Sequence, residues 1–172
     1  MSYQQEIDTP GHTTSIGMSH PEFIACFGAT PWTTYANEPP AGQIRIANPA
    51  AVNFTGDMLA AIAKTLPSSL FSIGGDEVNT NCYTTDPATQ QDLKDSGKTF
   101  DQALSDFVQS NQEVLTGIGK TPVVWEGESA IPQTCTTLTL LSFAEMVLNF
   151  NISLTQDTVV MCVRNQHVLL SS

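Results

Sequence analysis

The sequence is poor in basic residues and has no long apolar run. Only 6 of its 172 residues are lysine or arginine, against 17 acidic residues, and the formal net charge is −11. Nucleic acids and anionic membrane surfaces repel such a chain, so we expect neither as a partner. No stretch approaches the ~20 apolar residues of a membrane-spanning helix. Residues 1–5 also lack the basic start and apolar core of a signal peptide.

Cysteine is scarce too, and its spacing argues against zinc. Cys26, Cys82, Cys135 and Cys162 form no CxxC pair and have no histidine at ligand spacing. We therefore expect no metal and no cofactor. An apolar content of 41% is typical of a globular chain. The length suits one domain but falls short of the roughly 250 residues of a complete eight-stranded α/β barrel.

Expected strands and helices alternate along the chain. Asn53 can cap a helix that stops before Pro67, and Thr99 with Gln102 forms a capping box for a second helix that Gly119 ends. Expected strands end near residue 8 and occupy residues 69–75, 121–126 and 157–161. The prolines of residues 19–48 forbid a continuous helix there, and residues 76–98 read as a loop. This alternation predicts a parallel sheet with right-handed crossovers.

The expected strand ends carry polar or aromatic side chains, and such ends meet at one edge of a parallel sheet. They are Asp8 with His12, Asp76 with Glu77, and Trp125 with Glu126. Side chains 76 and 77 would point to opposite faces of a regular strand. Gly74-Gly75 lets the backbone leave strand geometry, so both carboxylates can serve one pocket.

Other interpretations of these carboxylates exist. An Asp-Glu doublet in an acidic protein is most often a solvated surface pair. A metal-dependent hydrolase could instead use Asp8, His12, Asp76 and Glu77 as ligands.

Four motifs in series favour one family. EIDTPGHT, SHPEF, IGGDEVNTNCY and TPVVWE stand in this order between Glu6 and Glu126. Together they resemble glycoside hydrolase family 20, the β-N-acetylhexosaminidases, and most closely its secreted fungal branch. The resemblance implies a (β/α)8 barrel of which this chain holds roughly strands three to six with their helices.

The resemblance also implies roles for individual residues. Glu77 resembles the general acid and base, and Asp76 the partner of the substrate's 2-acetamido N–H. The acetamido oxygen is then the nucleophile, an exception to the usual two-carboxylate mechanism.

Substrate binding is implied for four further residues. Trp125 looks like a wall of the acetamido pocket, and His12 like the histidine that supports the acid. Asp8 and Glu126 belong to the same motifs and could bind substrate or only hold the structure.

The fungal branch further implies a disulfide between Cys26 and Cys82, and therefore an extracellular, oxidising location. The sequons at Asn53 and Asn151 fit glycosylated surface loops of a secreted protein.

The expected function is hydrolysis of terminal N-acetylhexosamine from chitooligosaccharides or glycans. The chain lacks the family's early strands and its later tyrosine, tryptophan and glutamate, so we expect it to be inactive alone. The alternative is a truncated, non-catalytic product with at most weak sugar binding. A half barrel leaves open sheet edges, which pairing in a homodimer would cover.

Two segments depart from the family pattern. Residues 127–144 separate Trp125-Glu126 from Glu145-Met146, which are continuous in the family. Their end codons can encode splice signals, and so can Val163-Arg164. We therefore expect residues 127–144 to be a translated intron and residues 163–172 a non-native tail.

Overall fold

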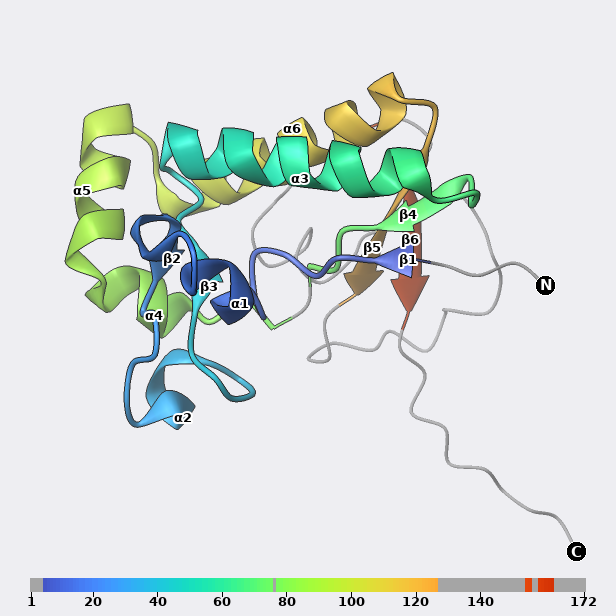
Figure 1. The fold of residues 1–172 in the computed structure, drawn as a ribbon. Coiled ribbons are helices and arrows are strands. Elements are labelled where there is room, and N and C mark those ends of the chain that lie inside the picture. The colour runs from blue at the N-terminus through green and yellow to red at the C-terminus, as the bar shows by residue number, and fades with distance from the viewer. Residues whose placement is uncertain (1–4, 76, 127–153, 156–157, 163–172) are drawn as a thin grey trace, which may run out of the picture.

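A parallel β-sheet forms the framework of the α/β fold (Figure 1). The computed structural model describes residues 5–75, 77–126, 154–155 and 158–162. The strands pair in the order β1-β4-β5-β6, all parallel. Their bounds are Gln5–Glu6 for β1, Leu70–Ser72 for β4, Thr121–Glu126 for β5 and Val159–Cys162 for β6. The predicted parallel sheet is confirmed.

Two long helices, α3 (Pro49–Thr65) and α6 (Phe100–Gly117), lie side by side over this sheet (Figure 1). The predicted capping box of α6 is confirmed. The Thr99 hydroxyl accepts a hydrogen bond from the Gln102 N–H, and the Gln102 side chain accepts one from the Thr99 N–H. The prediction worked because both partners are local in sequence.

The predicted start of α3 is wrong. Asn53 is not the N-cap, because the helix begins at Pro49 and Asn48 caps it. Oδ1 of Asn48 accepts hydrogen bonds from the N–H groups of Ala50 and Ala51. Proline is favourable in the first turn of a helix, where its missing N–H would have no partner. Asn53 lies inside α3 with its side chain exposed, so its sequon is on a helix and not in the predicted surface loop.

The predicted loop that ends at Lys98 is also wrong, because it contains two helices. These are α4 (Thr80–Thr85) and α5 (Pro87–Ser96), and they are capped by the side chains of Asn79 and Asp86. Both helices are rich in polar residues, so they carry little of the apolar periodicity on which the prediction depended. Their N-caps were the available signal.

Between β1 and α3 the chain makes an excursion of short elements. The proline-based prediction of no continuous helix is confirmed, since no α-helix of the excursion exceeds one turn. Strands β2 and β3 pair antiparallel. The elements are α1 (Thr14–Gly17), a 3₁₀ turn (Pro21–Phe23), β2 (Ile24–Ala25), α2 (Trp32–Tyr35) and β3 (Gln43–Ile44).

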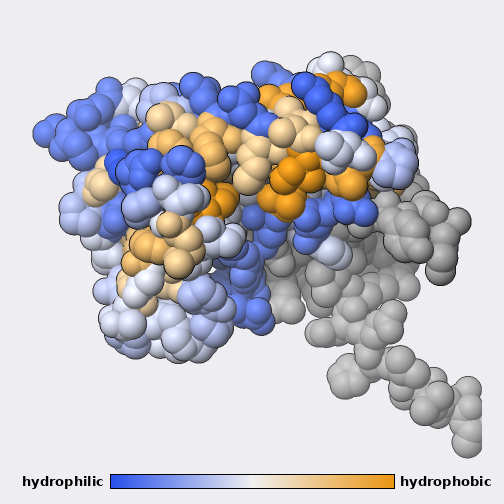
Figure 2. All heavy atoms as spheres, viewed as in Figure 1, coloured by the Kyte–Doolittle hydropathy of each residue, from blue (hydrophilic) through white to orange (hydrophobic). Residues whose placement is uncertain are grey.

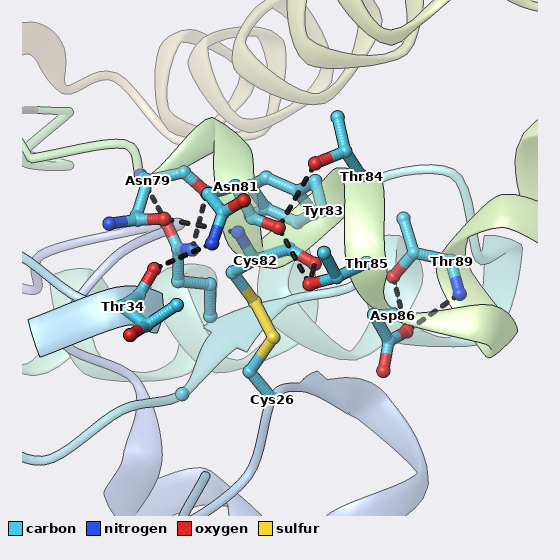
Figure 3. The surroundings of a disulfide bond; sticks show 12 residues. Cys26, Thr34, Asn79, Asn81, Cys82, Tyr83, Thr84, Thr85, Asp86 and Thr89 are labelled. Atoms are coloured by element: carbon cyan, nitrogen blue, oxygen red, sulfur yellow. Dashed lines mark hydrogen bonds between the residues drawn. A yellow bond between two sulfur atoms is a disulfide. The ribbon is translucent and has the colours of Figure 1, made fainter. Parts of the chain in front are cut away.

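A disulfide joins Cys26 of the excursion to Cys82 in α4 (Figure 3). It is the pairing that the resemblance implied. The side-chain amides of Asn79 and Asn81 also donate hydrogen bonds to residues in or beside α2. The excursion is thus fixed to the segment that follows the Asp76-Glu77 doublet.

The core lies between the helices and the sheet. Leu59, Phe71, Tyr83 and Phe107 are among its largest fully buried side chains. On the face shown in Figure 2, apolar residues form a band along α3. Within the described ranges, no helix is long and apolar enough to cross a membrane.

Candidate active site

Three polar side chains gather beyond the C-terminal ends of β1 and β4. Asp8 and His12 follow β1, and Glu77 follows β4. Nε2 of His12 lies 2.8 Å from Oε2 of Glu77 and 3.7 Å from Oδ2 of Asp8. The structure therefore brings together three of the residues that the sequence predicted for one site.

Unusual backbone conformations orient two of them. His12 and Glu77 have φ angles of 53° and 55°, a region that side-chain-bearing residues rarely occupy. Gly74 and Gly75 precede Glu77 with φ angles of 74° and 105°. The chain leaves strand geometry at the two glycines, as the sequence predicted. Strained residues of this kind concentrate at functional sites.

Asp8 fixes the bend that carries Glu77. Its Oδ1 accepts a hydrogen bond from the N–H of Gly75 at 3.1 Å. The next residue, Thr9, is buried and donates both its N–H and its hydroxyl to the carbonyl of Ile73. Asp8 thus joins the end of β1 to the glycine bend.

Oε2 of Glu77 is shielded from solvent and receives no hydrogen bond from the described residues. The His12 ring nitrogen is near enough to form an ion pair, but its N–H is not aligned on this oxygen as a hydrogen bond requires. The nearest charged neighbour of Oε2 is thus the His12 ring, at ion-pair distance.

A small hollow opens beside His12 and Glu77, and residues of the excursion complete its walls. Among these are Asn37, Glu38 and Gln43. The volume is about 10 Å³, about the space that one water molecule needs. This volume is far below the roughly 300–1,000 Å³ of most ligand pockets, so the described residues do not by themselves enclose one.

The sequence interpretation missed these three excursion residues. It treated the segment only as proline-rich, although its amide and carboxylate side chains were visible. Gln43 is tied to the backbone of Asn79 by two hydrogen bonds, of 2.9 and 3.0 Å. This link places the excursion beside Glu77.

Trp125 lies at the C-terminal end of β5, beside the bend. Its backbone N–H donates to the carbonyl of Gly74 at 2.9 Å. Its indole N–H donates to the carboxylate of Glu6, and the side chain is partly exposed.

Several predicted residues cannot be placed. Those outside the described residues are Asp76, the side chain of Glu126, Asn151, residues 127–144 and residues 163–172. Among the residues that are described, no group of three His, Cys, Asp or Glu could hold a metal ion.

Comparisons with known proteins agree with one another. The family model described as "Glycosyl hydrolase family 20, catalytic domain" matches residues 4–165. The chain is 36% identical over 124 residues to the beta-hexosaminidase of Arthroderma benhamiae, covering 70% of this chain and 20% of that protein. It is 32% identical over 126 residues to beta-hexosaminidase subunit alpha of Bos taurus, covering 70% and 22%. The chain thus spans about one fifth of these relatives.

Solved structures give the same result. An exo-beta-N-acetylglucosaminidase of the same family from Vibrio harveyi, in complex with N-acetylglucosamine, has a TM-score of 0.58 at 26% identity, covering 73% of this chain and 20% of that chain. A beta-N-acetylhexosaminidase from Bacteroides fragilis has a TM-score of 0.59 at 17% identity, covering 92% and 26%. The second likeness concerns the fold alone.

Proposed function

The chain belongs to glycosyl hydrolase family 20, and on this basis we propose that it carries the acid–base part of a β-N-acetylhexosaminidase site. The reaction is hydrolysis of terminal N-acetylhexosamine from chitooligosaccharides or glycans. The observation that supports it most directly is the 2.8 Å approach of His12 to Glu77 beyond the glycine bend. The fold we propose is part of a (β/α)8 barrel, roughly strands three to six.

Glu77 is the proposed general acid. Its carboxyl donates a proton to the glycosidic oxygen as the bond to the anomeric carbon breaks. The 2-acetamido oxygen of the substrate attacks the same carbon, which yields an oxazolinium ion and the protonated leaving group. Glu77, now a carboxylate, removes a proton from the water that opens this ring. The charge of Asp76 stabilises the oxazolinium ion.

Neighbouring residues support these steps. His12 lies within ion-pair distance of Glu77. It can stabilise the Glu77 carboxylate between the step that donates its proton and the step that regains one. Asp8 holds the glycine bend. Trp125 is the proposed wall of the acetamido pocket, where an indole face packs on the methyl group. Glu126 belongs to the same strand end.

A non-catalytic product with at most weak sugar binding is the second candidate. It is favoured by the span of about one fifth of the relatives and by the small size of the hollow. Incubating the purified chain with nitrophenyl N-acetylglucosaminide separates the two candidates. We expect no release above background from the chain alone. Release at an enzymatic rate would show that this part of the site suffices.

The assignment of Glu77 is tested in a chimeric enzyme, in which the present chain replaces the matching part of the Arthroderma benhamiae beta-hexosaminidase. Glu77→Gln should lower kcat/KM by roughly 10²–10⁴-fold on chitobiose, and by less on the nitrophenyl substrate, whose leaving group needs little protonation. The matched control is Glu113→Gln, an exposed carboxylate on α6. Unchanged rates on chitobiose for Glu77→Gln would overturn the assignment. Asp76→Asn should impair both N-acetyl substrates equally.

An extracellular location is part of the proposal. The Cys26–Cys82 disulfide is typical of proteins that fold in oxidising compartments. The exposed Asn53 fits glycosylation there.

A further inference from the structure

One carboxylate oxygen connects three neighbouring strands of the sheet. Oε2 of Glu6, in β1, accepts a hydrogen bond from the hydroxyl of Ser72 in β4 and another from Nε1 of Trp125 in β5. The two donor–acceptor distances are both 2.5 Å.

The strand register explains why this contact forms. Glu6 pairs with Ser72, and Ser72 pairs with Val123. Trp125 follows Val123 by two residues, so it projects from the same face of the sheet. Asp8 follows Glu6 by two residues and shares that face as well. Glu6 therefore lies on the face that carries the candidate site.

The same contacts hold the glycine bend. The Ser72 hydroxyl, which donates to Glu6, accepts a hydrogen bond from the N–H of Gly74 at 3.2 Å. The carbonyl of Gly74 accepts from the N–H of Trp125 at 2.9 Å. Both polar backbone groups of Gly74 thus bind residues that donate to Glu6.

Tryptophan has a single polar side-chain atom, which can only donate. With the backbone of Trp125 fixed in β5 and its Nε1 bound to Glu6, the plane of the indole ring is determined. Without an acceptor, the ring could rotate about its side-chain torsions and leave its N–H unpaired.

We propose that Glu6 is a positioning residue, which sets the plane of the Trp125 ring and thereby the size of the N-acyl group that the site accepts. Glu6 need not touch the substrate. The inference rests on the proposed function, in which Trp125 is a wall of the acetamido pocket.

The first test uses NMR to follow the indole N–H resonance of Trp125. The 172-residue chain carries Trp32→Phe, so Trp125 is its one remaining tryptophan. Glu6→Ala should move this resonance upfield and raise its exchange rate with water at least tenfold. Glu6→Gln, which keeps an acceptor oxygen, should restore most of the shift and protection. Glu113→Ala removes an exposed carboxylate elsewhere and should change neither. An unchanged resonance in Glu6→Ala overturns the proposal.

The second test titrates the same chain with N-acetylglucosamine and with N-propionylglucosamine, monitored by the Trp125 resonance. One methylene in an apolar pocket changes binding by roughly 10–200-fold, so the N-acetyl sugar should bind at least tenfold more tightly. Glu6→Ala should reduce this ratio to about threefold or less, whereas a purely structural loss would weaken both sugars equally. An unchanged ratio overturns this proposal alone, whereas no response of Trp125 to either sugar overturns it together with the proposed function. Neither test requires hydrolysis, so a failure of the proposed activity is seen separately.

Discussion

A Cβ atom on Gly74 would lie 1.8 Å from Oδ1 of Asp8 and 2.6 Å from its Cα. Side-chain movement cannot relieve the second contact, because a Cα belongs to the backbone. The absence of a side chain at Gly74 is therefore what allows β1 and the bend before Glu77 to come together.

Gly74→Ala should accordingly be severely destabilising. We expect it to lower the free energy of unfolding by about 2–5 kcal/mol, from the left-handed φ and the forced contact with Asp8. Gly97→Ala is the matched control, since Gly97 has a similar φ of 66° and nothing within 4 Å of an added Cβ. It should cost only about 1–2 kcal/mol. Urea denaturation measures both, and equal losses would contradict the argument.

We predict that the buried hydroxyl of Tyr83 makes the free energy of unfolding fall at high pH. Burial, assisted by the charge of Asp86, raises the pKa of Tyr83 well above its ordinary value. The folded state therefore favours the protonated phenol, and this contribution is complete below the unfolded pKa of about 10. It is lost as the pH rises from there towards the folded pKa, at about 1.4 kcal/mol per pH unit.

Tyr83→Phe isolates this effect. At pH 8 the variant should be about 1 kcal/mol less stable, because it lacks the hydrogen bond from the Tyr83 hydroxyl to the carbonyl of Ile44 at 2.8 Å. Above about pH 10 the difference should shrink and then reverse. Urea midpoints from pH 8 to 11 measure it, and a constant difference would refute the prediction.

We predict that replacing Asn111 by an apolar residue stabilises the folded protein. Asn111 is fully buried in α6, and neither Oδ1 nor Nδ2 has a partner among the described residues. Asn111→Leu keeps the branched shape of the side chain, removes this penalty and should raise the free energy of unfolding by about 1–2 kcal/mol. Thr55→Val is the contrasting variant, because its hydroxyl donates to the carbonyl of Ala51 at 2.8 Å. It should cost up to about 1 kcal/mol. A lower melting temperature for Asn111→Leu would show that its amide is satisfied.

We predict splice signals in the coding DNA at both ends of residues 127–144. If these residues are a translated intron, codons 127–129 contain GTGAGT and codons 143–145 contain TTTGCAG. Removing the intervening bases restores Trp-Glu-Glu-Met in frame. A second donor, GTAAGA, should encode Val163-Arg164. Sequencing the gene and its spliced transcript decides this, and codons without these signals would make the segment a genuine insertion.

Local signals account for the parts of the fold that could be predicted. Thr99 and Gln102 are three positions apart, so the start of α6 was readable without tertiary information. The convergence of Asp8, His12 and Glu77 was readable because they follow parallel strands. The left-handed conformations that bring His12 to Glu77 were not, since tertiary contacts impose them.

Long-range contacts explain what was missed at the site. Asn37 reaches the hollow because Cys26 is joined to Cys82, and because Gln43 bonds the backbone of Asn79. No pattern within residues 31–42 encodes these partners, which lie much later in the chain.

The disulfide also has a consequence for the thermodynamics of ligand binding. Asn37 accepts a hydrogen bond from Asn79 at 3.2 Å, and the carbonyl of Thr34 accepts one from Asn81 at 2.9 Å. This wall of the hollow is therefore ordered before a ligand arrives. Immobilising a flexible side chain on binding costs about 0.5–1.5 kcal/mol. Reduction of the disulfide would leave these hydrogen bonds alone to hold the wall, so each ligand would have to order more of it, and the weakening would appear as a less favourable entropy of association.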